Sequence, residues 1–138
     1  DAYDGIQFRL MPVPEPFPLM ITPRTLRLVL DTIVRNAVMH GFADSFYGEK
    51  RIAIRIAKDK LAGMAVISVA NNGLPAAEGF SEDIYERKFG KCGTTAHTGR
   101  GGFFVSNAMH FYKGFVTINT QDKNWPFIVN LHIQVSHE

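Results

Sequence analysis

The sequence predicts an α+β fold, a two-layer sandwich in which a mixed β-sheet is covered on one face by helices. Three observations predict it. Several segments alternate apolar and polar residues with the period of two that is typical of strands. Two longer segments, 22–41 and 102–114, repeat apolar residues at helical spacing instead. Strands follow one another as hairpins as well as being separated by helices, which favours a mixed sheet over a regular strand–helix alternation.

The length and charge of the chain limit the classes of function. Its 138 residues are enough for one core, and we treat residues 1–138 as a single domain, expected to be a fragment of a longer chain. The net charge is only +2 and the basic residues are scattered, so no nucleic-acid partner is expected. No segment approaches the roughly 20 apolar residues of a membrane span, so no membrane contact is expected. The single cysteine, Cys92, cannot form an internal disulfide, which favours a reducing, cytoplasmic setting.

The first half of the chain is expected to form a strand, a helix and a hairpin. Residues 5–10 are a candidate strand, followed by a proline-rich extended connection. Thr22 suits the N-cap of the first helix and Pro23 its first position, while Gly41 suits a C-terminal cap. Segments 51–59 and 64–70 alternate in polarity around a turn at Gly63, and so predict a hairpin.

The second half is expected to hold a long irregular segment, a second helix and a closing hairpin. Residues 71–101 are rich in turn-forming residues and predict only one short helix, near 81–87; such long loops are usually functional. The second helix, 102–114, carries three phenylalanines that we expect in the core: Phe103, Phe104 and Phe111. Segments 115–121 and 127–135 are expected to pair as the last hairpin.

A polar stripe lies beside the apolar face of the first helix. On a helical wheel Thr32 and His40 fall within about 40° of Asn36. A buried amide is costly unless a partner satisfies it. One interpretation is that Asn36 caps a neighbouring loop. The other is that its side-chain oxygen is a ligand for Mg²⁺, which takes few protein ligands and leaves the other positions to phosphates and water.

Two further segments have the composition of ligand-binding sites. The stretch "GTTAHTGRGG" (93–102) runs directly into the second helix, and its glycines permit close approach of a phosphate to the unpaired N–H groups of a helix N-terminus. The segment does not have the Walker pattern and does not follow a strand. The strand 64–70 ends at Asn71-Asn72-Gly73, where a plain turn or a bound purine would explain the sequence. In the second case Asn71 would present its carbonyl to the purine's exocyclic amine, and Gly73 would let the base approach.

In this order, "RNAVMHG", "NNG" and the glycine-rich segment resemble the ATP-binding fold of the GHKL superfamily, also known as the Bergerat fold. The closest likeness is to the catalytic, ATP-binding domains of sensor histidine kinases, and it extends from about residue 20 to 135. "LDTIVRNAVMHG" is similar to their asparagine motif, and "FGKCGTTAHTGRGG" to their Phe-containing segment and ATP lid. The resemblance implies that Asn36 binds Mg²⁺ and that Asn71 and Gly73 contact adenine. With His40, which lies on the same helix edge as Asn36, the remaining candidate nucleotide contacts are Thr94, Thr95, Gly99, Arg100, Gly101 and Gly102.

Three positions depart from the family pattern. The family's adenine-binding aspartate falls on Asn71, whose amide oxygen still accepts a hydrogen bond from the adenine amine. The lid glycines are displaced by one position. Thr32 stands where gyrase-like ATPases carry a catalytic glutamate, and without that carboxylate no general base activates water. Thr32 therefore favours a kinase over an ATPase.

The resemblance implies a histidine protein kinase domain that binds ATP and Mg²⁺ and presents the γ-phosphate to a histidine. That histidine would stand on a separate dimerisation domain, and it and the response regulator would lie outside this chain. No catalytic residue is assigned within the chain, because phosphoryl transfer depends mainly on positioning and charge neutralisation. Two alternatives stay open: a degenerate, non-catalytic nucleotide-binding or interaction module of the same fold, and a GHKL ATPase.

Overall fold

The computed structural model describes residues 5–11, 17–59, 63–76, 80, 85 and 100–136. The expected order of strands and helices is confirmed over these residues. The elements are β1 (Ile6–Leu10), α1 (Pro23–Asn36), the π-helical turn η1 (Ala37–Gly41), β2 (Lys50–Asp59), β3 (Met64–Asn71), α3 (Arg100–Phe111), β4 (Phe115–Asn119) and β5 (Phe127–Gln134).

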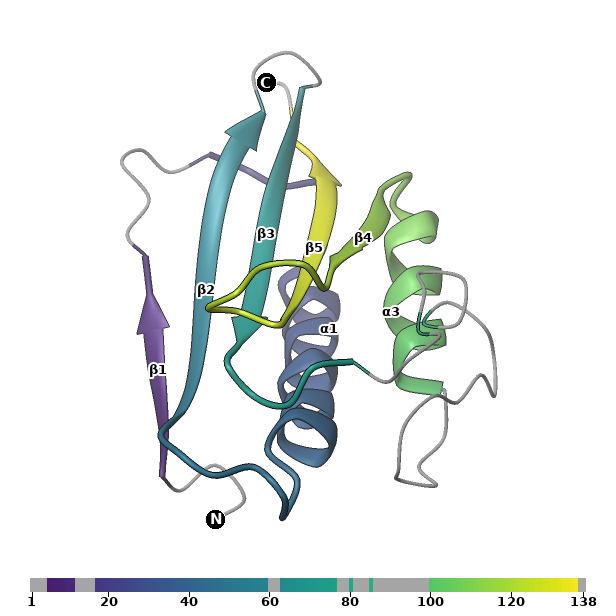
Figure 1. The fold of residues 1–138 in the computed structure, drawn as a ribbon. Helices are drawn as coiled ribbons and strands as arrows, with labels where there is room; N and C mark the ends of the chain where they lie inside the picture. Colours follow the sequence, from purple (N-terminus) through teal and green to yellow (C-terminus); the bar gives the residue numbers. More distant parts are fainter. Residues whose placement is uncertain are drawn as a thin grey trace.

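The strands form one mixed sheet in the order β1-β2-β3-β5-β4. Strand β1 runs parallel to β2, and all other neighbours are antiparallel. Both expected hairpins, β2–β3 and β4–β5, are therefore confirmed. In Figure 1 α1 lies behind the sheet and α3 runs beside β4. The molecule is the α+β sandwich that the sequence predicts.

The core lies between the sheet and the two helices. Ile67 of β3 stands opposite Leu131 of β5, and Val69 stands opposite Val129; all four side chains are buried. The helices add Val29 and Ile33 from α1 and Val105 and Met109 from α3. Burial of one such side chain contributes about 1.5–3 kcal/mol, so this layer holds the helices on the sheet.

The opposite face of the sheet is more polar. The Ser68 hydroxyl donates to the side-chain oxygen of Asn130 at 2.7 Å, and Thr117 hydrogen-bonds to the ring of His132 at 2.9 Å. The alternation of apolar and polar residues along these strands therefore reflects a sheet with helices on one face only.

The start of α1 is as predicted. Thr22 is the N-cap, and its hydroxyl oxygen accepts a hydrogen bond from the Thr25 N–H at 3.2 Å; Pro23 occupies the first helical position. The Thr22 hydroxyl also lies 3.3 Å from the hydroxyl of Tyr112. This contact ties the end of α3 to the start of α1.

The end of this helical segment differs from the prediction. The α-helix stops at Asn36 and a π-helical turn follows, in which the Phe42 N–H donates to the Ala37 carbonyl at 2.9 Å. Gly41 is not a left-handed cap, because the only described glycines with positive φ are Gly5, Gly48 and Gly63. A uniform wheel of 100° per residue could not predict this widened turn, since it depends on what Gly41 contacts.

The prediction that the phenylalanines of α3 lie in the core is wrong for Phe104 and Phe111, while Phe103 is half-buried. The side chains of Phe104 and Phe111 are 40% and 79% exposed, whereas Val105 and Met109 are buried. Phe104 and Phe111 are seven residues apart and share one side of the helix, but that side faces away from the sheet. Among the described helices, none is long and apolar enough to cross a membrane.

The end of α3 generates a stability prediction. Lys113 has a φ of 62°, a left-handed conformation that costs roughly 1 kcal/mol for a residue with a Cβ, and the following Gly114 N–H donates to the Met109 carbonyl. We expect Lys113→Gly to raise the free energy of unfolding by about 0.5–1 kcal/mol in urea denaturation. Lys123→Gly, in an exposed turn without positive φ, is the control and should give no increase. Equal losses of stability in the two variants would contradict the left-handed conformation of Lys113.

Candidate nucleotide site

The end of the first helical segment meets the end of β3 at two glycines. A Cβ at Gly41 would lie 2.8 Å from the side-chain oxygen of Asn71, and a Cβ at Gly73 would lie 2.3 Å from the Gly41 carbonyl oxygen. Neither position has room for a side chain. The Leu74 N–H donates to the same Gly41 carbonyl at 2.7 Å. Gly41 is therefore required because the Asn71 side chain packs against its Cα, and Gly73 because the Gly41 backbone packs against its own.

Asn71 is buried at this junction, with 5% of its surface exposed. Its Oδ1 accepts a hydrogen bond from the Gly73 N–H at 2.9 Å. Within the described part of the chain, its Nδ2 has no acceptor. A buried amide with an unused donor is costly unless a ligand or water accepts from it.

Asn72 has a different role from its neighbour. Its Oδ1 accepts from the Arg51 N–H at 2.7 Å, and its Nδ2 donates to the Glu49 carbonyl at 2.8 Å. The side chain thus continues the pairing of β2 and β3 past the last ladder pair. The sequence analysis assigned no role to Asn72, although its place directly after a paired strand was the available signal.

Asn36 is the last residue of α1 and is half-buried. Its side chain makes no cap hydrogen bond to η1, and none to any other described residue. The capping interpretation is therefore not supported. Gly41 follows Asn36 by five positions and contacts Asn71, so both asparagines lie at the same end of the molecule. His40 is exposed on η1.

The side-chain oxygen of Asn36 fits a hard cation that keeps most of its water and phosphate ligands. Among the residues that the structure describes, no group of three or more His, Cys, Asp or Glu side chains could hold a metal ion.

The start of α3 includes three of the predicted lid residues. Arg100, Gly101 and Gly102 form its first turn, so the helix begins two residues earlier than the predicted 102, whereas Thr94, Thr95 and Gly99 lie outside the described residues. A Cβ at Gly102 would lie 1.9 Å from the carbonyl oxygen of Tyr85. Gly102 is thus required by packing, whatever else it contacts.

An aromatic cluster lies between the start of α3 and Asn71. The ring centroids of Phe80 and Tyr85 are 5.4 and 6.4 Å from that of Phe127, and Phe127 stands directly opposite Asn71 in the sheet. Among the described residues the buried Tyr85 hydroxyl has no hydrogen-bond partner, and burial raises its pKa above the usual value of a tyrosine. Tyr85 contacts Gly102, and its ring neighbour Phe127 stands opposite Asn71. The start of α3 and Asn71 therefore lie at the same end of the fold.

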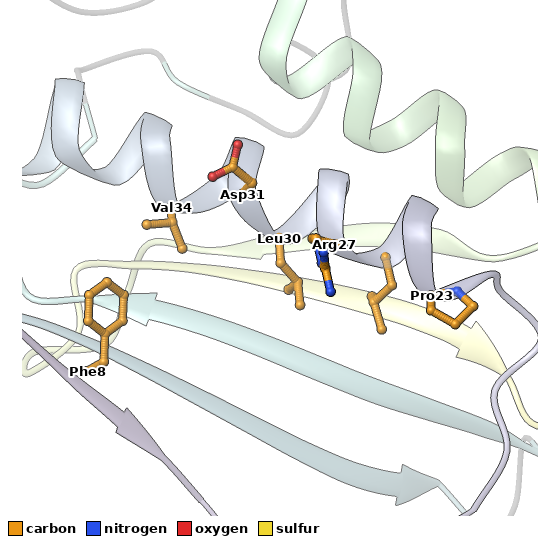
Figure 2. Close-up of a pocket in the computed structure, with 7 residues that line it drawn as sticks. Phe8, Pro23, Arg27, Leu30, Asp31 and Val34 are labelled. Carbon is orange, nitrogen blue, oxygen red and sulfur yellow. The ribbon is translucent and has the colours of Figure 1, made fainter. Parts of the chain in front are cut away.

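The residues that an ATPase would use do not form its site. The Thr32 hydroxyl donates to the Leu28 carbonyl at 2.8 Å, within its own helix. The neighbouring Asp31 is paired with Arg35, as the spacing predicts, and points away from the sheet in Figure 2. Neither residue supplies a carboxylate beside Asn36.

A groove lies between α1 and β1, on the flank of the helix that Asp31 borders. Phe8 of β1 forms one side and α1 the other (Figure 2). Its lining is mostly apolar and consists of Phe8, Pro23, Leu26, Arg27, Leu30, Asp31 and Val34. It runs along α1 and includes neither Asn36 nor Asn71, so it is not part of the candidate nucleotide site.

Comparison with known proteins identifies the class of fold. No protein-family model and no curated protein matches the sequence. The structure is similar to the ATP-binding domain of PrrB from Mycobacterium tuberculosis, with a TM-score of 0.72 and 19% identity over 98% of this chain and 84% of that one. It is similar to the mycobacterial sensor histidine kinase MprB, with a TM-score of 0.74 and 13% identity over 97% and 86% of the two chains. Full-length ShkA in complex with AMPPNP matches with a TM-score of 0.70 and 20% identity over 97% of this chain and 27% of that one.

The chain therefore has the fold of the ATP-binding catalytic domains of sensor histidine kinases. This confirms the histidine-kinase-like α+β fold that is expected from the sequence.

The hydrogen bonds of the two asparagines generate a second prediction. Asn72→Asp would place a carboxylate oxygen against the Glu49 carbonyl, so we expect a loss of about 2 kcal/mol in the free energy of unfolding at pH 7. Asn71→Asp keeps the oxygen that accepts from Gly73 and is the matched control, with a smaller loss. The new carboxyl at position 72 is favoured in its protonated, donating form in the folded state, which raises its pKa. The deficit should therefore shrink as the pH falls toward 4. Equal losses in the two variants at pH 7 would contradict the roles assigned here.

Proposed function

We propose that this domain binds Mg²⁺-ATP between the end of α1 and the start of α3. Asn36 supplies an oxygen ligand to the metal, and Asn71 and Gly73 contact the base. Arg100, Gly101 and Gly102, together with Thr94, Thr95 and Gly99, face the phosphates, and His40 lies at the margin of the site. The domain then presents the γ-phosphate to a histidine on a separate dimerisation domain, as the catalytic part of a histidine protein kinase in two-component signalling.

The observation that carries the proposal is the junction at Gly41. It places two asparagine side chains with unused hydrogen-bonding groups, Asn36 and Asn71, at one end of the sheet. Within the described part of the chain neither side chain uses all of its hydrogen-bonding groups on protein partners, so both can bind a ligand. A nucleotide with its metal would use both, one at the base and one at the phosphates.

The start of α3 supports the phosphate end of the proposal. Its first N–H groups have no partners within the helix and carry the positive end of the helix dipole. Gly102 packs against the backbone of Tyr85, and the Tyr85 ring lies beside that of Phe127. Phe127 in turn stands opposite Asn71 in the sheet. A nucleotide bound at Asn71 would therefore extend toward this helix end.

The chemistry supported best is phosphoryl transfer to another domain rather than hydrolysis. Thr32 bonds within α1 and Asp31 pairs with Arg35, so neither acts as a general base at Asn36. In phosphoryl transfer the protein's main contribution is to position the groups and to neutralise charge, which the metal and the helix end would supply here.

The proposal is tested by calorimetric titration with AMPPNP, with and without Mg²⁺. We expect a dissociation constant in the micromolar to sub-millimolar range that depends on Mg²⁺. Asn36→Ala should weaken binding by about tenfold or more, because the metal loses a ligand. In the absence of Mg²⁺ the wild type and the variant should bind with similar, weak affinity.

Asn119→Ala is the matched control, since Asn119 lies on the face of the sheet that the helices leave open and should not affect binding. Wild-type protein that binds no nucleotide at several millimolar would contradict the proposal. It would instead favour the degenerate interaction module, which the replacement of aspartate by Asn71 suggests.

A further inference from the structure

The orientation of the Asn71 amide is fixed by its surroundings. The Gly73 N–H donates to the Asn71 amide across 2.9 Å between Gly73 N and Asn71 Oδ1. Only the oxygen of an amide accepts such a hydrogen bond, because the NH₂ group is a donor. The amide also turns its oxygen toward Gly41: a Cβ built at Gly41 would lie 2.8 Å from Oδ1 and 3.6 Å from Nδ2. Oδ1 is therefore held inside the junction, and Nδ2 is the amide atom left for a ligand.

A free Nδ2 changes which purine edge the site accepts. An aspartate at this position offers only acceptors, which suit the 6-amino group of adenine. The Nδ2 of Asn71 is a donor, and the 6-oxo group of hypoxanthine or guanine is an acceptor. Oδ1 keeps a second lone pair for the N1–H of a 6-oxopurine. For adenine the same amide donates to N1 and accepts from the 6-amino group, so adenine sits with its positions 1 and 6 exchanged relative to a 6-oxopurine.

We propose that Asn71 sets the base specificity of this site, and that the site takes 6-oxopurine nucleoside triphosphates as readily as ATP. The inference rests on the proposed nucleotide site. The exchange of a carboxylate for an amide removes the repulsion between O6 and a negative oxygen, while the contacts that an amide makes to adenine are kept.

The test compares Mg²⁺-ITP with Mg²⁺-ATP, because the two differ only at position 6 and the adjoining N1. Dissociation constants are measured by calorimetry for the wild type and Asn71→Asp at about pH 8, where the new carboxyl is ionised. For the wild type we expect the two constants to agree within about threefold. For Asn71→Asp we expect the ratio of the ITP constant to the ATP constant to rise by about fivefold or more, since the carboxylate repels O6.

Asn36→Ala is the matched control: it should weaken both nucleotides and leave their ratio unchanged, because it acts at the metal. The folded state of Asn71→Asp is checked by its thermal unfolding, and its ATP affinity should be kept or increased. Wild-type protein that binds ATP but rejects ITP, or a ratio that stays within about threefold on substitution, would overturn the inference and leave the ATP site standing. Failure of the wild type to bind either nucleotide would overturn the proposed function and this inference together.

Discussion

The approach of Gly41 to the end of β3 is the constraint on which the candidate site depends. Two glycine positions without room for a Cβ let the first helical segment and the strand touch through backbone atoms, and the Leu74 N–H to Gly41 carbonyl hydrogen bond closes the contact. The widened turn after Asn36 brings Gly41 to this contact. As a result Asn36 and Asn71, 35 positions apart in the sequence, lie at one end of the sheet.

The rest of the fold holds this junction in place. The apolar faces of α1 and α3 pack on β3 and β5, and Tyr112 ties the end of α3 to the N-cap of α1. Asn72 extends the pairing of β2 with β3 at the strand end, so Asn71 is presented from a fixed backbone. In a buried setting a hydrogen-bond donor without an acceptor is unfavourable, and the same donor binds an acceptor on a ligand more strongly than it would in water.

The strands, both hairpins and the N-cap could be predicted from the sequence, because they depend on local alternation and on Thr22 and Pro23. The π-helical turn and the true role of Gly41 could not, since both follow from a contact with Asn71, far away in the chain. Phe104 and Phe111 were assigned to the core by residue type, but the side of α3 that faces the core is the one that carries Val105 and Met109, with Gly102 packed against Tyr85. For the site, the sequence indicated Asn36 and Asn71 as candidates. It could not indicate that Oδ1 of Asn71 is already bonded to Gly73.

The proposed site requires that Asn36 and Asn71 contact one bound nucleotide from two sides. The most direct measurement follows the side-chain amide resonances of ¹⁵N-labelled protein as Mg²⁺-ATP is added. We expect the Asn36 and Asn71 resonances to shift along one common saturation curve, while the Asn72 resonances, whose amide is bonded to the backbone of Glu49 and Arg51, move little. Saturable binding that leaves the Asn36 and Asn71 resonances unmoved, or that shifts only one of them, would contradict it.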